Sequence, residues 1–322
     1  MQIGLDIGST TIKIAVLDDA GKLLFAKYQR HYSQIAEKIQ ELLQELFAQF
    51  PLLKSARLAV SGSAGLGIAE SCGLQFVQEV FAEKVCTESL NPGTDVVIEL
   101  GGEDAKILFL GRHFDARMND SCAGGTGAFI DQMATLLNVD VNQLDALSLK
   151  HEKIYPIASR CGVFAKSDIQ PILNQGGRKE DVAASIFQAV VDQTIAGLTQ
   201  GRDLDGKIVF LGGPLFFLQG LRQRFIETLN LDEENGIFPE NAQVFAAMGA
   251  AICADQYDAT DYDSLISRLE NAVTASSITN PMPPLFESED EYDVVRSKEI
   301  TLKPAAGQAF EVGKTYYISA IG

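Results

Sequence analysis

The segment 3–13 contains residue types that bind phosphate and magnesium at the junction of two strands. Asp6 stands near the end of an apolar strand, where its carboxylate could hold a hydrated Mg²⁺. Gly8 lets the backbone approach a ligand, and Ser9, Thr10 and nearby N–H groups could cradle phosphate oxygens. The segment has no GxxxxGK[ST] pattern and no helix directly after the glycine. It therefore predicts a phosphate-binding hairpin rather than a Walker loop, with a hairpin that binds nothing as the alternative.

Two later segments have the same strand-then-glycine design. Residues 95–107 place Gly101, Gly102, Glu103 and Asp104 between two apolar strands, and residues 207–215 place Gly212 and Gly213 after another strand. Two acidic glycine hairpins followed by a late Gly-Gly turn resemble the phosphate-1, phosphate-2 and adenosine motifs of the actin–sugar kinase–Hsp70 superfamily. The resemblance implies an α/β fold of two duplicated actin/Hsp70-like (ribonuclease H-like) lobes around a nucleotide cleft.

Two cysteines precede helix starts. Cys122 stands directly before the glycine-rich run 123–127, and Cys161 stands 39 residues later before the helical segment 163–175. Free N–H groups and the helix dipole stabilise thiolates at such positions, so the pair could supply half of a four-cysteine iron–sulfur site. A symmetric dimer would complete Cys₄ on its two-fold axis. The alternative is that the glycines bind nucleotide or only cap a helix.

Composition excludes several classes of protein. The chain has 322 residues, of which 46% are hydrophobic and 21% charged, as is typical of a globular protein. A net charge of −17 argues against binding nucleic acid, and no apolar run reaches the roughly 18 residues needed to span a membrane. The N-terminus begins within a strand, so we expect no signal peptide, a cytoplasmic location and reduced thiols. Cys72, Cys86 and Cys253 are interpreted as small buried hydrophobes, and the three histidines receive no role.

The order of apolar patterns predicts alternating strands and crossover helices, which is typical of an α/β protein. The predicted strands are 2–7, 11–17, 22–29, 56–61, 95–100, 106–110 and 207–212. The predicted helices are 31–49, 123–137, 140–150, 163–175, 178–200, 215–229 and 241–255. We expect an N-terminal ATPase lobe (1–110), a C-terminal lobe that carries the cluster cysteines (111–256), and a linker with a partial β segment (257–322).

The last of these regions changes in composition. A proline-rich spacer (280–284) and an acidic run (287–292) precede short β-like segments at 298–303 and 315–321. The final Ala-Ile-Gly resembles the start of another strand like 3–6. We therefore expect the sequence to be part of a longer protein.

The motifs NDSCAGGTGAF and SRCGVFAKSDI, set between LDIGSTTIK, LGGEDAK and FLGGP, closely resemble the ATPase activators of 2-hydroxyacyl-CoA dehydratases. The family includes the ATPase subunits of benzoyl-CoA reductases, and the resemblance covers about residues 1–255. It implies a homodimer that shares one [4Fe–4S] cluster. It also implies ATP hydrolysis that drives a low-potential electron from reduced ferredoxin or flavodoxin into an iron–sulfur dehydratase.

The resemblance also implies roles for individual residues. Cys122 and Cys161 would ligate the cluster, and Asp6 would hold Mg²⁺. Asp104, in the second phosphate loop, would act with Asp6 in catalysis. Phosphates and nucleotide would contact residues of the three turns and of the glycine-rich run: Gly8, Ser9, Thr10, Thr11, Lys13, Gly101, Gly102, Gly125, Thr126, Gly127, Gly212 and Gly213.

One residue departs from the family pattern. Small activators read Gly-Gly-Gln-Asp in the second loop, whereas Glu103 stands here in place of the glutamine. Glu103 could position the attacking water or alter the hydrolysis rate through its added charge. This departure resembles very large relatives with two activator-like domains, in which the cluster could be shared within one chain.

Two other functions fit the same superfamily. A sugar or small-molecule kinase would need a substrate pocket with a catalytic aspartate but no paired cysteines before helices. A nucleotide-gated scaffold like the actin relatives would use hydrolysis to time assembly. Brown colour after anaerobic purification would separate the activator from both.

Overall fold

The computed structural model describes residues 1–111, 113–119, 123–158 and 161–275, together with Phe286, Ser288 and 290–293. Residues Met1–Ala275 form one compact unit. Several sequence predictions fall outside the described residues: Cys122, the proline-rich spacer, Glu287 and Glu289 of the acidic run, and the β-like segments 298–303 and 315–321.

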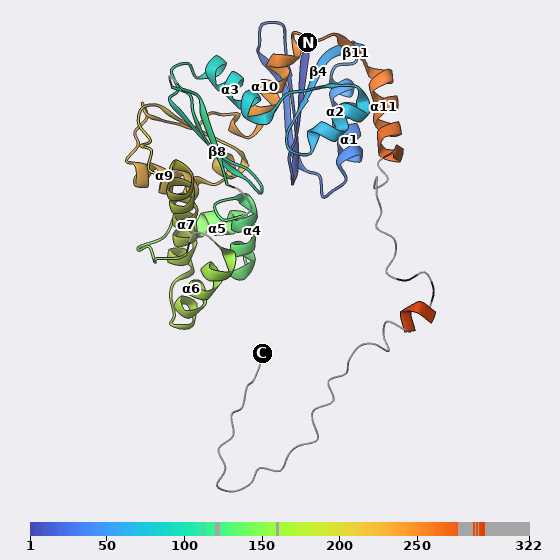
Figure 1. The fold of residues 1–322 in the computed structure, drawn as a ribbon. Helices are drawn as coiled ribbons and strands as arrows, with labels where there is room; N and C mark the ends of the chain where they lie inside the picture. Colours follow the sequence, from blue (N-terminus) through green and yellow to red (C-terminus); the bar gives the residue numbers. More distant parts are fainter. Residues whose placement is uncertain are drawn as a thin grey trace, which may run out of the picture. The chain divides into compact units, whose positions relative to one another are not determined.

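The first lobe is built on a mixed sheet in the order β11-β4-β1-β2-β3, with β5 paired beside β4 (Figure 1). Its strands are β1 (Gln2–Ile7), β2 (Thr11–Leu17), β3 (Leu23–Arg30), β4 (Ser55–Ser61), β5 (Gln75–Phe76) and β11 (Ala259–Asp261). Strand β1 is antiparallel to β2 and parallel to β4. Helices α1 (Ile35–Gln49), α2 (Gly65–Cys72) and α11 (Tyr262–Ala275) cover one face, where α1 contributes a buried apolar stripe.

The second lobe repeats this pattern in the order β10-β9-β6-β7-β8. Its strands are β6 (Val96–Leu100), β7 (Ala105–Phe109), β8 (Asp115–Met118), β9 (Ile208–Leu211) and β10 (Gly236–Ile237). As in the first lobe, the leading strand is antiparallel to the next strand in the chain and parallel to a later one, here β9. The matching topology confirms the predicted duplication.

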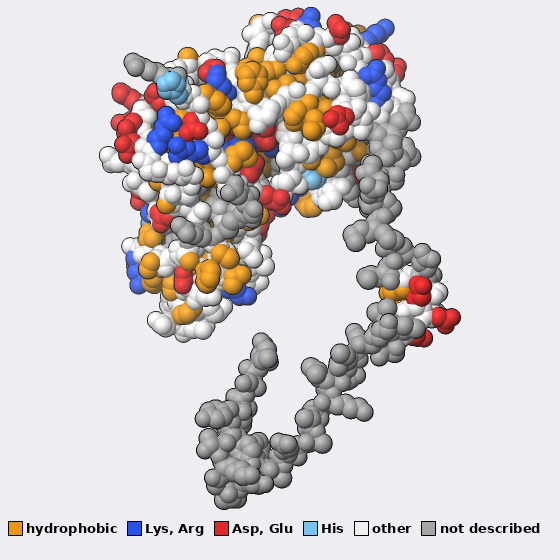
Figure 2. Space-filling model, in the orientation of Figure 1, with side chains coloured by type: hydrophobic (Ala, Val, Ile, Leu, Met, Phe, Trp, Pro, Cys, Tyr) orange, Lys and Arg blue, Asp and Glu red, His pale blue; other side chains and the backbone are white. Residues whose placement is uncertain are grey.

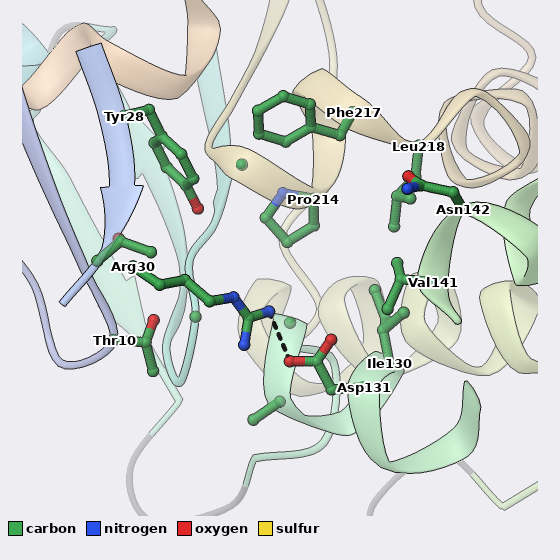
Figure 3. A pocket seen from close by; sticks show the side chains of 15 residues that line it. Thr10, Tyr28, Arg30, Ile130, Asp131, Val141, Asn142, Pro214, Phe217 and Leu218 are labelled. Carbon is green, nitrogen blue, oxygen red and sulfur yellow. Dashed lines mark hydrogen bonds and ion pairs between the residues drawn. The ribbon is translucent and has the colours of Figure 1, made fainter. Parts of the chain in front are cut away.

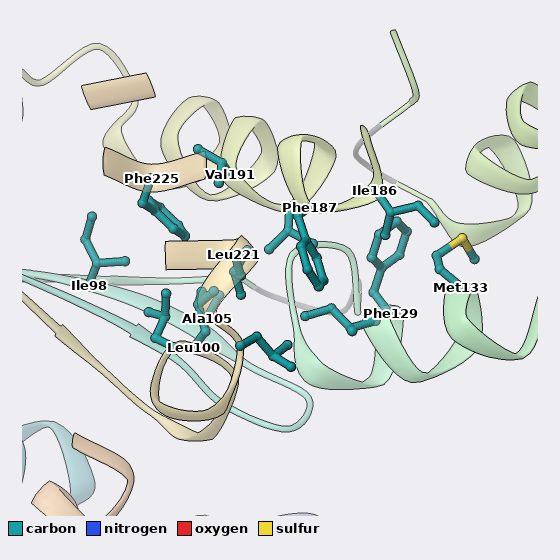
Figure 4. Packing of buried hydrophobic residues seen from close by; sticks show 14 of the residues in the cluster. Ile98, Leu100, Ala105, Phe129, Met133, Ile186, Phe187, Val191, Leu221 and Phe225 are labelled. Atoms are coloured by element: carbon teal, nitrogen blue, oxygen red, sulfur yellow. The ribbon is translucent and has the colours of Figure 1, made fainter. Parts of the chain in front are cut away.

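Among the described residues, six helices belong to the second lobe. They are α4 (Gly127–Leu136), α5 (Val141–Ser148), α6 (Gly162–Asn174), α7 (Lys179–Thr199), α8 (Gly213–Phe217) and α9 (Gln219–Leu229). Side chains of α4, α7 and α9 fill the space over the sheet, with Phe129, Phe187 and Phe225 at the centre of the core (Figure 4). By length and composition α7 is the one helix in the described part of the chain that could cross a membrane, and 67% of its most apolar window is buried.

Helices α3 (Glu79–Leu90) and α10 (Phe245–Ala254) lie between the two sheets and contact each other closely (Figure 1). A Cβ atom on Gly249 of α10 would overlap the backbone of Ala82 in α3, and one on Gly4 of β1 would overlap the backbone of α10. The core between the sheets combines residues from both lobes with these helices. Because α3 and α10 are packed backbone to backbone, they form a firm link between the lobes.

The structure differs from the predicted boundaries. Strands β6 and β7 pair within the second sheet, so the boundary predicted at 110 cuts a sheet that begins near residue 96. Strand β11 pairs with β4 and α11 packs on α1 and α2, so the compact unit includes residues assigned to a linker from 257. The helix predicted from 31 begins at Ile35, because Tyr32 and Ser33 adopt left-handed backbone conformations.

On the face shown in Figure 2, acidic, basic and apolar side chains are interspersed over the described residues. Of the isolated cysteines, Cys72 and Cys86 are fully buried and Cys253 is 9% exposed, which confirms the prediction that they act as small apolar side chains.

Candidate nucleotide site

The first two glycine turns face each other across the space between the lobes. The first is closed by the N–H of Gly8, which donates to the carbonyl of Thr11 at 2.9 Å. A Cβ atom on Gly102, in the second turn, would overlap the hydroxyl of Thr10. The close approach of these turns requires glycine at 102 and brings the two predicted phosphate loops together.

His31 braces the first turn from behind. Its ring Nε2 lies 3.0 Å from the carbonyl oxygen of Gly8, and its backbone N–H donates to the carbonyl of Thr10 at 3.2 Å. Because Nδ1 accepts a hydrogen bond from the N–H of Ser33, Nε2 carries the proton and donates to Gly8. The ring is 4% exposed. Sequence patterns assigned His31 no role, and no local pattern signals it because the contact depends on the turn after β3.

The second turn holds the start of α4. The N–H groups of Gly127 and Ala128 donate to the carbonyls of Gly101 and Gly102 at 3.0 and 2.7 Å. Gly125 adopts a left-handed conformation, and the buried Thr126 hydroxyl donates to the carbonyl of Ala123 at 2.6 Å. The glycine-rich run therefore docks the helix on the phosphate loop, and Cys122 directly precedes this run in the sequence.

The third turn closes the same space. Gly212 has a φ of 93° and lies against the carbonyl of Leu100, so a side chain there would overlap the second-lobe backbone. Gly213 approaches the hydroxyl of Tyr28, which comes from β3 of the first lobe. All three predicted turns therefore meet at one place.

A cavity of about 230 Å³ opens between these turns (Figure 3). Residues from both lobes line it: Thr10, Thr11, Tyr28, Arg30, Gly102, Gly127, Ala128, Ile130, Asp131, Val141, Asn142, Gly213, Pro214, Phe217 and Leu218. One end holds the hydroxyls and glycines of the phosphate turns, and the other is formed by apolar side chains. This combination suits a ligand with an anionic and an aromatic end.

A second, smaller cavity lies at the phosphate end and is lined by Asp6, Thr11, Lys13, Glu79 and Gly101 among others. Asp6 is 1% exposed; its Oδ2 pairs with Nζ of Lys13 at 2.7 Å, whereas its Oδ1 has no hydrogen-bond partner in the described part of the chain. A buried carboxylate oxygen without a partner suits a Mg²⁺ ion or its water, and Mg²⁺ commonly takes one or two carboxylates plus phosphate oxygens. The residues present therefore fit the predicted ion. Lys13, which we expect near the phosphates, forms an ion pair with Asp6 in this structure.

Five carboxylates and two lysines form a charged cluster below the phosphate turns, which we call the Lys106 cluster. Its members are Asp6, Lys13, Glu79, Glu83, Glu99, Asp104 and Lys106. The fully buried Nζ of Lys106 lies 2.7 Å from Glu79, 3.0 Å from Glu99, 3.3 Å from Asp104 and 3.5 Å from Glu83. It joins α3 to the second sheet.

Burial raises the pKa of Glu79, Glu83 and Glu99, opposed by the charge of Lys106, and the pKa of Glu99 reaches about 7. Burial lowers the pKa of Lys106, but the surrounding carboxylates outweigh this effect, so its pKa is raised well above the ordinary value. Lys106 is therefore charged, and the carboxylates around it are costly to ionise together.

The raised pKa of Glu99 predicts how stability depends on pH. Between pH 4.5 and about 7 the folded state holds the Glu99 proton and the unfolded state releases it, so stability falls as pH rises. The fall from this one group is about 3 kcal/mol, and Glu99→Gln should remove most of it. Urea unfolding of the wild type and of Glu99→Gln at pH 5 and pH 8 measures the difference. An equal change in unfolding free energy between the two pH values for both proteins would contradict the raised pKa.

The remaining predicted residues are placed as follows. Ser9 and Glu103 are exposed, while Asp104 lies beside Lys106. Glu79, at the start of α3, faces the small cavity and was missed, because nothing in its local sequence distinguishes it from an ordinary first-turn acidic residue.

Cys161 is a half-buried free thiol immediately before α6. The next apolar side chains are strongly exposed, Val163 by 68% and Phe164 by 66%. Within the described ranges, no group of three or more His, Cys, Asp or Glu side chains is arranged to hold a metal ion. Cys122, the other predicted cluster ligand, lies outside these ranges.

Two matching lobes with facing glycine turns and a shared cleft define the fold of actin, Hsp70 and the sugar kinases. Residues 3–254 match the BadF/BadG/BcrA/BcrD ATPase family, and the chain belongs to this family.

Relatives and solved structures agree with this assignment. The chain is 32% identical over 260 residues to the (R)-2-hydroxyglutaryl-CoA dehydratase activating ATPase of Acidaminococcus fermentans, a match that covers 78% of this chain and 96% of that protein. It is 28% identical to the 2-hydroxyisocaproyl-CoA dehydratase activator of Clostridioides difficile, over 78% of this chain and 94% of that protein. The solved structure of a Clostridium difficile activator with bound ADPNP is 25% identical, covers 87% of this chain and 99% of its own, and superposes with a TM-score of 0.66.

Proposed function

We propose that this ATPase activates an iron–sulfur 2-hydroxyacyl-CoA dehydratase, or a related benzoyl-CoA reductase-like partner, by driving a low-potential electron into it. Its relatives include named dehydratase activators and, more distantly, a component of the benzoyl-CoA reductase of Thauera aromatica. The observation that carries the proposal is the docking of α4 on the second phosphate turn through the carbonyls of Gly101 and Gly102. A change at the nucleotide phosphates would thereby move the segment that follows Cys122.

ATP hydrolysis would take place at the facing turns. Asp6 would hold Mg²⁺, and N–H and hydroxyl groups of Ser9, Thr10 and Thr11 would contact phosphate oxygens together with Gly101 and Gly102. A carboxylate would orient the attacking water. Glu103 was predicted for this task, and Glu79 is an equally suitable candidate because it faces the small cavity beside Asp6.

The cluster would be a [4Fe–4S] centre held by Cys122 and Cys161 with the same pair from a second copy or a second activator domain. When bound, such a cluster stores and passes single electrons. Two observations support this placement: Cys161 is a free thiol at the start of a 13-residue helix, and the exposed Val163 and Phe164 beside it form an apolar face that another protein could cover. Reduced ferredoxin or flavodoxin would be the donor, in the cytoplasm.

Mg²⁺-dependent ATP hydrolysis by the anaerobically purified protein tests the ATPase step. We expect phosphate release without any added sugar, and no phosphorylated sugar when hexoses are supplied. Turnover that requires a sugar and produces its phosphate ester would instead support the kinase alternative.

A further inference from the structure

Arg30 and Asp131 meet across the nucleotide cavity. Arg30 ends β3 in the first lobe, Asp131 lies in the first half of α4 in the second, and Nη2 of Arg30 lies 2.7 Å from Oδ2 of Asp131 (Figure 3). The side chains are 52% and 37% exposed, and the hydrogen bond to Asp131 raises the pKa of Arg30. Both side chains line the cavity, so a bound nucleotide would contact them.

Asp131 lies between the two ends of the cavity. Thr10 and Gly102 mark the phosphate end, while Val141 and Leu218 belong to the apolar end. Asp131 stands beside Ile130 on the wall between them (Figure 3). A nucleotide with its phosphates at the turns and its base on the apolar wall would place its ribose at this carboxylate.

We propose that Asp131 reads the ribose of the nucleotide, accepting hydrogen bonds from its 2′- and 3′-hydroxyls after Arg30 releases it. This inference rests on the proposed binding of nucleotide between the lobes. An ionised carboxylate is an acceptor-only group whose two oxygens match the two donors of a vicinal diol. A carboxylate performs this task for the ribose in dinucleotide-binding folds.

The ion pair with Arg30 positions the Asp131 carboxylate and still allows the ribose to reach it. Half-exposed ion pairs contribute little to stability, so the sugar can displace the guanidinium at small cost. Before the nucleotide enters, the ion pair with Arg30 holds the Asp131 carboxylate at the wall of the cavity. Once released, the guanidinium lies next to the phosphate end, where it can pair with an anionic oxygen.

Binding of ADP and of 2′,3′-dideoxy-ADP, measured with Mg²⁺ by calorimetry, tests the proposal. We expect the wild type to prefer ADP by about tenfold or more, the worth of hydrogen bonds to a charged acceptor. Asp131→Ala should bind both nucleotides about equally, by losing affinity for ADP alone. Arg30→Ala should keep a preference for ADP, because the two acceptor oxygens of Asp131 remain.

Asp192→Asn removes the same charge from an exposed position on α7 and should behave as wild type. If Asp131→Ala fails to show a wild-type melting temperature, Asp131→Asn provides the second variant, with a reduced preference expected. An unchanged preference in a folded Asp131 variant, or no preference in the wild type, would overturn the inference while leaving the ATPase proposal intact. Failure of the wild type to bind ADP at all would overturn both.

Discussion

Replacing Lys106 by methionine should destabilise the protein by about 3–5 kcal/mol, the usual cost of leaving a buried charge without its partner. Methionine keeps much of the side-chain volume, so the loss arises from the charge. Four carboxylates lie within 3.5 Å of the Lys106 ammonium, and three of them have pKa values already raised by burial. Without the lysine these groups must take up protons or admit water.

Urea unfolding of Lys106→Met at pH 8 measures this cost, and the same measurement at pH 5 should show a smaller one because the carboxylates are then more easily protonated. Lys84→Met is the matched control. Lys84 lies on α3, the helix that Lys106 contacts from β7, and it pairs with the exposed Glu88 of that helix. It should change stability by less than about 1 kcal/mol. Equal effects for the two lysines would show that the Lys106 cluster does not hold α3 to the second sheet.

Asp6→Asn should lower the rate of ATP hydrolysis by about 10²–10³-fold, because removing one preorganised electrostatic contact at the reacting group has an effect of that size. Asparagine can still accept a hydrogen bond from Lys13, so the fold should survive. The carboxylate charge that would hold Mg²⁺ is lost. Anaerobic phosphate-release assays at several Mg²⁺ concentrations measure the effect.

Excess Mg²⁺ should restore part of the Asp6→Asn activity, whereas Asp192→Asn, which alters an exposed carboxylate on α7, should match the wild type at every concentration. Wild-type turnover by Asp6→Asn would place the metal on other residues and contradict the role assigned to the partnerless oxygen of Asp6.

The glycine turns and the strands around them could be predicted from sequence because their signals are local. Strand β1 and the hairpin at Gly8 match the prediction, since alternation and glycine placement depend on neighbours in the chain. The Lys106 cluster could not be predicted, because Glu79 and Glu83 lie on a helix 27 and 23 residues before Lys106 and meet it only through the packing of α3. His31 was missed for the same reason.

Lobe boundaries were the weakest prediction. The chain enters the second sheet through α3 and returns through α10. Strands β6 and β7 therefore join the second sheet and β11 joins the first, although their neighbours in sequence do not indicate this. Strand β11 is three residues long, too short for periodicity to detect, although α11 has a clear amphipathic pattern. The hairpins have local sequence signals, so they predict the fold. The lobe boundaries depend on strand pairing between segments that are distant in the sequence.

Iron and sulfide content, measured anaerobically with the visible spectrum, tests the central claim most directly. The wild type should hold about four irons per two chains and absorb as an iron–sulfur protein. Both signals should be lost in the Cys122→Ser/Cys161→Ser double variant and kept in Cys253→Ala, which alters a cysteine on α10. Wild-type protein that holds no iron after reconstitution, or a double variant that holds as much as the wild type, would contradict the account.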